Sequence, residues 1–365
     1  MDKIFEPLQS GPLSYSNRIV MAPMTRARAG EDRVPNEMMM EYYNIRSNAG
    51  LIITEATHIS EQGIGWSQTP GIHTKEQVEG WKKITDAVHL SGGRIFLQLW
   101  HTGRASHSSF NGMQPVSSSP VAKADDDPVF TDEGKKAPEV PRALSVDEIK
   151  KTVDDYRHAS ECAFQAGFDG VEIHAANGYL IDQFLRDGVN QRDDQYGGSI
   201  ENRLRFLLEV LEAVKSVWAP QRIGVRFSPT NPFNSMSDSD PRALFTAAAK
   251  ALNSHDLAYL HLLEARPGVD HQMAADDAPY IAPDIRKVFN GLLMLNAGYS
   301  YETGNRAIEE GEADLIAYGV PFLANPDLVQ RFATKSPLNE PDQSTFYTHG
   351  EQGYLDYPMF EVAEA

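Results

Sequence analysis

The sequence has a single cysteine, Cys162, among its 365 residues. One cysteine can form neither a disulfide within the chain nor the cysteine cluster that a structural zinc or an iron–sulfur centre requires. The residue lies in the stretch 145–166, whose amphipathic pattern is typical of a helix. We therefore expect Cys162 to be a small buried side chain.

Long apolar runs are also missing. No segment reaches the ~18 apolar residues that indicate a membrane-spanning helix. The first residues, Met1-Asp-Lys-Ile-Phe5, lack the apolar core of a signal peptide. We expect a cytoplasmic protein that does not enter a membrane.

Basic residues are outnumbered. Lys and Arg total 33 against 51 Asp and Glu, so the formal net charge is −18. Because an acidic surface repels phosphodiester backbones, we expect no nucleic-acid partner, although a local basic cleft could still bind a phosphorylated small molecule. The composition leaves open whether the protein is a monomer or a homodimer.

Strand-like and helix-like patterns alternate along the chain. Strands are predicted at 19–22, 51–54, 95–98, 171–174, 223–227, 257–263, 292–296 and 315–318. Helices are predicted at 36–48, 75–91, 146–166, 201–218, 241–254, 283–289, 301–310 and 326–334. Eight βα units predict a single (β/α)8 TIM barrel over 1–365 rather than an open doubly wound sheet, which seldom uses so many.

Two segments lie outside this repeat. Residues 4–13 contain a Gly11-Pro12 turn and are predicted to form a hairpin that closes the barrel bottom. Residues 102–142, between the third strand and the third helix, are rich in Ser, Pro and Asp. This length is too great for a simple connection, so we interpret the insertion as a lid or a mobile loop.

Polar residues begin where the fourth predicted strand ends, in Gly170-Val-Glu-Ile-His-Ala-Ala-Asn-Gly-Tyr179. His174 and Asn177 can both donate N–H groups to one oxygen, and Tyr179 carries a phenol whose ordinary pKa is ~10. Two donors and a proton source suit a carbonyl or nitro substrate whose neighbouring carbon must be protonated. Each residue alone has a simpler structural explanation. Together, at the end of a barrel strand, they favour catalysis.

The ends of the other strands carry further ligand-binding candidates. These are Pro23, Met24, Thr25, Glu55, Ala56, Gln98, Arg226, Asn296, Ala297, Gly298, Tyr318 and Gly319. A hydroxyl, an amide and a fixed cation, from Thr25, Gln98 and Arg226, could hold a ring rich in carbonyl and N–H groups. Glycines after the last two strands allow backbone N–H groups to approach a phosphate. The pattern indicates a phosphate-bearing heterocycle, although Gln98 or Arg226 alone could equally fill the polar rim of a barrel.

The chain resembles the Old Yellow Enzyme family of flavin-dependent ene-reductases, nearly from end to end. The motifs that carry the resemblance, in the family's order, are Ala22-Pro-Met-Thr-Arg26, Gln98-Leu-Trp-His-Thr-Gly-Arg104, His174-Ala-Ala-Asn-Gly-Tyr179, Asp194-Gln-Tyr-Gly-Gly-Ser199, Arg226-Phe-Ser-Pro229, Ala324-Asn-Pro-Asp-Leu328 and Gly353-Tyr-Leu-Asp-Tyr-Pro358. Any one motif is weakly specific, but the ordered set is highly specific.

The resemblance implies a cofactor and a reaction. FMN would be bound non-covalently by Pro23, Met24, Thr25, Ala56, Gln98, Arg226, Ala297, Gly298, Tyr318 and Gly319. NAD(P)H would reduce the flavin and then leave, so that an α,β-unsaturated carbonyl, maleimide or nitroalkene could enter the same cavity. This ping-pong use of one site needs no Gly-x-Gly-x-x-Gly fingerprint. Hydride would pass from flavin N5 to the alkene while His174 and Asn177 hold the activating oxygen and Tyr179 supplies the proton.

The same resemblance implies cavity walls made by Trp66, Trp100 and Tyr347, for each of which ordinary packing is the alternative. Trp66 stands where many relatives have tyrosine. A second departure concerns the phosphate: many relatives have arginine directly after the glycine of the eighth strand, but here Gly319 is followed by Val320 and Pro321. We expect FMN to bind without that cation.

Two other classes of function remain open at this point. A non-catalytic flavin-binding or redox-sensing barrel would share the same residues. A metal-dependent barrel lyase would need a His/Asp/Glu cluster at the strand ends. His174 has only Glu55 and Glu172 as possible partners, and we expect Glu172 to point away from the barrel. The single cysteine argues against the related flavoproteins that carry an iron–sulfur domain, and we expect no metal.

Overall fold

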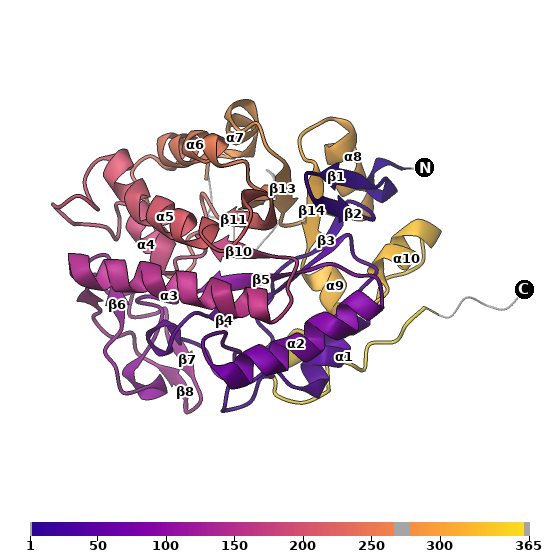
Figure 1. Ribbon diagram of the computed structural model, residues 1–365, viewed down its shortest axis with the longest axis horizontal. Coiled ribbons are helices and arrows are strands. Elements are labelled where there is room, and N and C mark those ends of the chain that lie inside the picture. Colours follow the sequence, from indigo (N-terminus) through magenta and orange to yellow (C-terminus); the bar gives the residue numbers. More distant parts are fainter. Residues whose placement is uncertain (1, 266–277, 361–365) are drawn as a thin grey trace, which may run out of the picture.

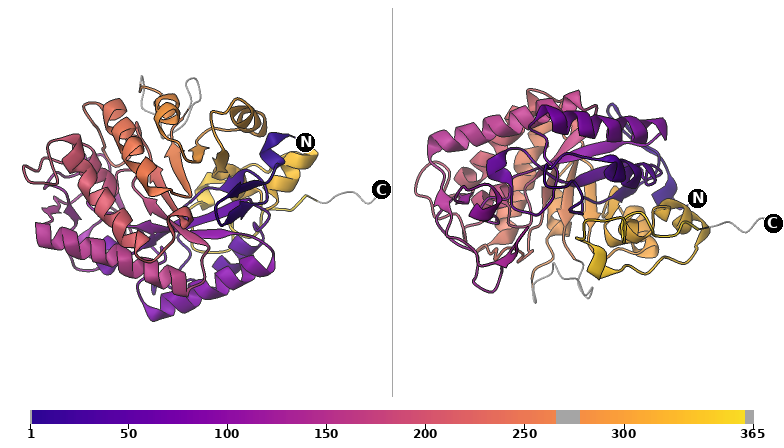
Figure 2. Two further views of the ribbon diagram at one scale, coloured as in Figure 1. Left: turned by 45° about the horizontal axis from the view of Figure 1, so that its top comes forward. Right: turned by 90° about the horizontal axis from the view of Figure 1, so that it is seen from below.

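A computed structural model describes residues 2–265 and 278–360. Parallel strands form a closed barrel in the order β3-β4-β5-β10-β11-β12-β13-β14, with helices around it (Figure 1; Figure 2). The strands are β3 (Ile19–Met21), β4 (Leu51–His58), β5 (Ile95–Trp100), β10 (Gly170–His174), β11 (Ile223–Phe227), β12 (Tyr259–Leu263), β13 (Leu293–Asn296) and β14 (Leu315–Tyr318). The predicted TIM barrel and each of its predicted strands are confirmed.

The predicted helices are also present, with ends that differ by a few residues. They are α1 (Glu37–Asn44), α2 (Lys75–Leu90), α3 (Val146–Gln165), α5 (Ile200–Lys215), α6 (Pro241–Leu252), α7 (Ala282–Val288), α8 (Tyr301–Glu309) and α10 (Leu328–Thr334). Capping boxes, such as Ser145 with Glu148 in α3, fix where several of them begin. The short helices α4 (Leu180–Leu185) and α9 (Val320–Ala324) are not predicted, because segments of this length show no clear helical period.

The prediction that Glu172 points away from the barrel is wrong. Glu172 and His174 are two positions apart on β10, so strand alternation places them on the same face. Glu172 is fully buried and contacts Gln98 of β5 and His261 of β12. Because β11 separates β10 from β12, the contact between Glu172 and His261 runs through the barrel interior.

The N-terminal hairpin closes the barrel at the amino ends of its strands. Strand β1 (Leu8–Ser10) pairs antiparallel with β2 (Leu13–Tyr15). Leu13 and Tyr15 are buried in one apolar cluster with interior side chains such as Phe96 and Met294. The predicted hairpin is therefore confirmed, although it spans 8–15 rather than 4–13.

The segment 102–142 contains one turn of 3-10 helix, η3 (Ser108–Phe110), and four short strands. Strand β6 (Val116–Ser117) pairs with β9 (Arg142–Ala143), and β7 (Val129–Thr131) forms a hairpin with β8 (Gly134–Lys136). Phe130, on β7, stacks on Trp66 with ring centroids 5.6 Å apart. The β7–β8 hairpin thus lies beside Trp66, one of the predicted cavity walls. That the segment 102–142 acts as a lid remains a prediction.

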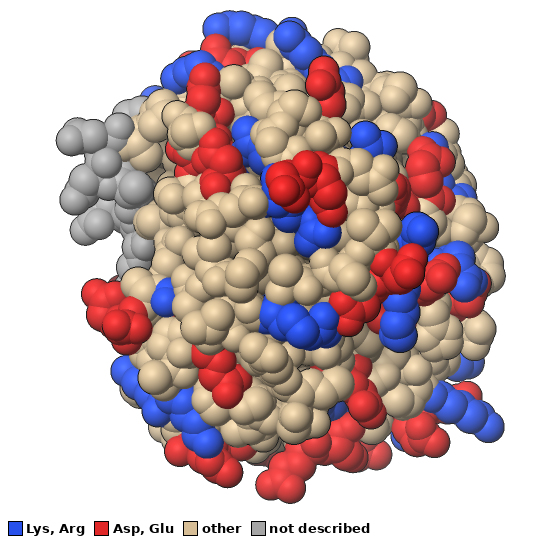
Figure 3. Space-filling model, turned by 90° about the vertical axis from the view of Figure 1, so that its left-hand side faces the viewer, with Lys and Arg blue, Asp and Glu red and all other residues tan. Residues whose placement is uncertain are grey.

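The helices outside the barrel include the one that carries the single cysteine. Cys162 is buried in α3 with a free thiol, as predicted. Within 2–265 and 278–360, no helix has both the length and the apolar character needed to cross a membrane. On the face drawn in Figure 3, acidic and basic side chains are interspersed.

Candidate active site

The predicted site residues meet at the carboxyl ends of the barrel strands. Ala56, Trp100 and Tyr179 form one buried cluster, and Trp66 packs against it. His174 closes β10, and a turn carries the chain from there to Tyr179 at the start of α4. Residues predicted from four separate stretches of sequence are therefore neighbours in space.

His174 is a neutral donor beside this cluster. Its ring meets the ring of Tyr179 edge-on, with centroids 5.0 Å apart. Burial holds the pKa of His174 well below its usual range, and the neighbouring Arg226 guanidinium and His261 ring add to the effect. Nδ1 is buried without a hydrogen-bond partner among the described residues. A neutral imidazole with one such nitrogen can bind a ligand oxygen or N–H group without competing for a structural bond.

The amide of Asn177 is oriented by its surroundings. The residue has φ of 58°, a left-handed conformation that asparagine tolerates better than most residues. Its Oδ1 accepts a hydrogen bond from Asn231 Nδ2 at 2.9 Å, and its backbone N–H donates to Ser228 Oγ at 2.7 Å. Because Oδ1 is already used, Nδ2 is the end of the amide left to donate to a ligand.

Tyr179 remains protonated in this environment. Burial raises the pKa of its phenol, and nearby Tyr347 adds to the effect. Hydrogen bonds with Trp66 and Asn234 act in the opposite direction without reversing it. The phenol therefore keeps its proton at neutral pH and can give it to a substrate.

The ring-binding candidates lie around the same end of the barrel. Gln98 and Arg226 are buried inside it, on β5 and β11. Arg226 Nη2 donates to Asn296 Oδ1 at 2.9 Å, while its Nε is buried without a partner among the described residues. A buried guanidinium with an unused N–H fits a ring that carries carbonyl oxygens. Thr25 and Met24, after β3, are only half-buried.

The phosphate-binding candidates follow β13 and β14. Ala297 and Gly298 both have positive φ, 98° and 70°, so successive N–H groups turn together there. The side chain of Tyr318 bonds Ser300 O at 3.2 Å, which leaves only its backbone for a ligand. Val320 is 43% exposed and begins α9, directly after Gly319.

The aromatic wall has a member that the sequence analysis missed. Trp66 contacts Tyr347, with ring centroids 5.2 Å apart, and also Phe130 from the insertion. Nothing in the sequence marks Phe130, because its partner lies far away in the chain. His261 was missed as well, although a histidine in the apolar strand Tyr259–Leu263 is a signal that could have drawn attention.

The carboxylates near the site do not assemble into a metal centre. Across the described ranges, no group of three or more His, Cys, Asp or Glu side chains is placed to hold a metal ion. Glu55 accepts hydrogen bonds from Arg26 N–H and Tyr43 O–H, both at 3.2 Å. Burial raises the pKa of Glu55 to about 7, and these two contacts work against that rise. Its oxygens are therefore engaged by the protein.

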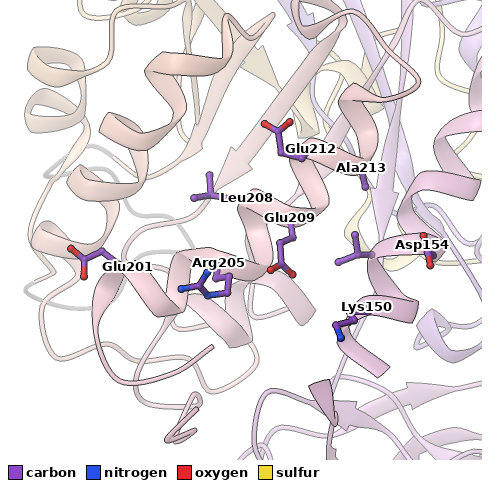
Figure 4. Close-up of a pocket in the computed structure, with 9 residues that line it drawn as sticks. Lys150, Asp154, Glu201, Arg205, Leu208, Glu209, Glu212 and Ala213 are labelled. Atoms are coloured by element: carbon purple, nitrogen blue, oxygen red, sulfur yellow. The ribbon is translucent and has the colours of Figure 1, made fainter. Parts of the chain in front are cut away.

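A groove on the outside of the barrel is separate from this site. It measures about 590 Å³ and lies between α3 and α5 (Figure 4). Its lining comes from those two helices, including Lys150, Asp154, Arg205 and Glu209, and from no strand end. The strand-end residues therefore mark a different part of the molecule.

Comparison with known proteins agrees with the geometry. The model of the NADH:flavin oxidoreductase / NADH oxidase family matches residues 3–339. 12-Oxophytodienoate reductase 1 of Oryza sativa subsp. japonica is 44% identical over 366 residues, covering 98% of this chain and 93% of that protein. A protein of Leishmania infantum named probable flavin mononucleotide-dependent alkene reductase is 45% identical over 364 residues and 98% of each chain.

Solved structures are equally similar. An old yellow enzyme homologue from Zymomonas mobilis has a TM-score of 0.95 at 48% identity, covering 98% of this chain and 100% of that one. Morphinone reductase in complex with tetrahydroNAD has a TM-score of 0.92 at 44% identity, with 99% of each chain covered. Sequence motifs, barrel and relatives agree: this chain belongs to the NADH:flavin oxidoreductase / NADH oxidase family, the family of Old Yellow Enzyme.

Proposed function

We propose that this FMN-dependent oxidoreductase takes hydride from NAD(P)H and reduces the C=C bond of an α,β-unsaturated carbonyl, a maleimide or a nitroalkene. The observation that carries the proposal is the group at the end of β10. There, a buried His174 nitrogen without a protein partner and an oriented Asn177 amide lie beside the protonated Tyr179 phenol. The naming of the Leishmania relative as an alkene reductase, and the nicotinamide analogue bound by morphinone reductase, support it.

The residues present fit FMN at its ring. The unused Nε–H of Arg226, the amide of Gln98 and the hydroxyl of Thr25 would hold the isoalloxazine. Backbone groups of Pro23, Met24, Ala56, Ala297, Gly298, Tyr318 and Gly319 would complete the cofactor site. When bound, FMN supplies the hydride that reaches the alkene.

The chain's own contribution is to polarise the alkene and to supply a proton. His174 and Asn177 donate to the activating oxygen, where negative charge develops as hydride reaches the β-carbon. Tyr179 gives its proton to the α-carbon, so that one hydride and one proton saturate the bond. Trp66, Trp100 and Tyr347 form the walls of the cavity, and the segment 102–142 acts as its lid.

A substrate screen tests this proposal. Steady-state oxidation of NADH and of NADPH should be measured with a cyclic enone, a maleimide and a nitroalkene, and the saturated products identified. We expect alkene-dependent turnover with stoichiometric formation of the saturated product. A flavin-containing protein that oxidises nicotinamide at the same slow rate with or without every alkene would instead be a flavin-binding or redox-sensing barrel.

Replacing Val320 with arginine is expected to tighten FMN binding about 10- to 100-fold, because a hydrogen bond to a charged group contributes ~1.5–3 kcal/mol and ~1.4 kcal/mol corresponds to tenfold in affinity. The reason is that Val320 offers the phosphate no cation. Flavin fluorescence titrations of both apoproteins measure the two dissociation constants.

Val320→Met, which adds length without charge, is the matched control for this prediction. Pro321 restricts the backbone at the preceding residue, so an arginine there has a limited set of directions. Equal FMN affinity in the wild type and in Val320→Arg would mean that another group already supplies the cation.

Phe130→Ala tests the lid. Loss of the stacked ring removes an aromatic contact worth ~0.5–1.5 kcal/mol, so we expect KM for bulky enones to rise about two- to tenfold. Small enones should be affected less. Phe164→Ala is the matched control, because Phe164 is an exposed phenylalanine on α3 that contacts Trp218 edge-on. If both variants change KM equally, the β7–β8 hairpin does not act on the substrate.

A further inference from the structure

Glu172 is the centre of a buried polar layer inside the barrel. Gln98 Nε2 donates to its Oε1 at 2.7 Å, and His261 Nδ1 bonds its Oε2 at 2.9 Å. Glu172 and His261 are fully buried, and Gln98 is 1% exposed. Side chains from β5, β10 and β12 thus meet at one carboxylate, and one of them, Gln98, is assigned to the flavin ring.

The strand register explains why these side chains meet. Glu172 on β10 lies opposite Gln98 on the neighbouring strand β5. Arg226 on β11 lies opposite His174 on β10 and opposite His261 on β12. The interior towards the amino ends of the strands is instead apolar, with Phe96 and Met294 among its side chains. The polar layer therefore lies between these apolar side chains and the end of the barrel that carries the site.

Glu172 is ionised in this layer, and the positive charge of Arg226 favours that form. Burial acts to raise the pKa of Glu172, but His261, Arg226 and the hydrogen bond from Gln98 together lower it. Burial lowers the pKa of His261, so this residue is neutral and donates its Nδ1–H to the carboxylate. A buried ion of this kind is costly without partners. Here Gln98 and His261 supply hydrogen bonds, and the charge of Arg226 adds an electrostatic stabilisation.

We propose that Glu172 is a positioning residue that fixes the amide of Gln98 and moderates the charge of Arg226, and thereby sets the affinity for FMN and the ease of its reduction. A carboxylate only accepts hydrogen bonds, so the NH2 group of Gln98 must face Glu172 and the amide cannot rotate by half a turn. This leaves the amide oxygen to accept from a ring N–H. The inference rests on the proposed function in taking the bound ring to be flavin.

The charge of Glu172 acts on the ring in the opposite sense to that of Arg226. Reduction adds negative charge to the ring, which Arg226 stabilises and a nearby carboxylate opposes. Glu172 thus keeps the reduced cofactor from being held too tightly to pass on its hydride. Removing the negative charge without changing the shape should make the cofactor easier to reduce.

Two variants separate charge from position. Glu172→Gln keeps the side-chain length and loses the charge, and the His261 ring can change tautomer to suit the new amide. We expect the ratio of affinities for reduced and oxidised FMN to rise about tenfold, ~30 mV for a two-electron couple. Glu172→Asp keeps the charge but is one methylene shorter, so it cannot hold Gln98 and His261 together. There we expect FMN to bind about tenfold more weakly, with a smaller change in potential.

The measurements are FMN titration of each apoprotein by fluorescence and reduction of each holoprotein by dithionite against reference dyes. Asp327→Asn is the control, because Asp327 is a buried carboxylate paired with Arg331 outside the barrel. It should leave the potential unchanged. Dithionite replaces NAD(P)H, so these readouts stand even if alkene turnover, and with it the proposed function, fails.

The outcomes are distinct. A potential shift in Glu172→Gln but not in Asp327→Asn, with weaker binding in Glu172→Asp, supports the proposal. Wild-type potential in the first variant and wild-type affinity in the second would overturn it and make Glu172 a purely structural partner of Gln98 and His261. If Glu172→Gln does not fold, Glu172→Asp decides alone: unchanged FMN affinity in a folded protein rejects the positioning role.

Discussion

Replacing His174 and Asn177 together by alanine should slow alkene reduction by about 10²-fold or more for each lost donor, the usual effect of removing an oxyanion-stabilising group. We propose that both residues bind one activating oxygen, because each has a side-chain nitrogen that no described protein group uses. His174 Nδ1 has no partner among the described residues, and Asn231 occupies only the oxygen of the Asn177 amide. Binding of a phenolic ligand, followed by its charge-transfer absorbance, should weaken in parallel.

The experiment must distinguish loss of the two hydrogen-bond donors from misfolding of the variant. Alanine is disfavoured at the left-handed backbone of Asn177, so His174→Ala with Asn177→Gly is the companion variant. Flavin content and the temperature of unfolding serve as controls for folding. A double variant that is fully loaded with FMN and reduces enones at the wild-type rate would show that the oxygen is bound elsewhere.

Tyr179→Phe should impair enone turnover by ~10²–10⁴-fold, the range for loss of a positioned general acid, while sparing the reaction with NAD(P)H. The proton is needed only when the alkene is reduced, so the two half-reactions should separate. Nitroalkenes should be affected less, because hydride addition gives a stabilised nitronate that solvent can protonate later. Since burial raises the pKa of Tyr179, no loss of rate through this group is expected from neutral to mildly alkaline pH.

Anaerobic stopped-flow absorbance resolves the two steps. With NAD(P)H, the decay of the flavin band in Tyr179→Phe should match that of the wild type. When an enone is then added, the flavin band of the variant should return slowly. When a nitroalkene is added, the band should return at a rate closer to that of the wild type. Loss of the first step with retention of the second would assign Tyr179 to nicotinamide binding rather than to protonation.

Much of this arrangement could be predicted from local patterns. The barrel strands are short apolar runs bounded by turn residues, and polar residues begin where each strand ends, as at His174 and Arg226. Those signals lie within a few neighbouring residues, so they can be recognised in the sequence alone. The capping box at Ser145, where α3 begins, is a local signal of the same kind.

What could not be predicted depends on contacts between distant segments. Phe130 meets Trp66 only because the insertion folds back against the segment that follows β4, and Asn231 orients Asn177 from another loop. Glu172 was misplaced for a different reason: its position on the same face as His174 follows from alternation, but a carboxylate inside a barrel is unexpected until its partners are seen. His261, one of those partners, lies 89 positions further along the chain.

The most direct test of the proposed function is a colour change under anaerobic conditions. The purified protein should be yellow, should bleach on addition of NAD(P)H, and should recover its colour when an enone is then added, with formation of one equivalent of the saturated product. Bleaching that no enone, maleimide or nitroalkene reverses would contradict alkene reduction and leave a flavin-binding protein without this activity.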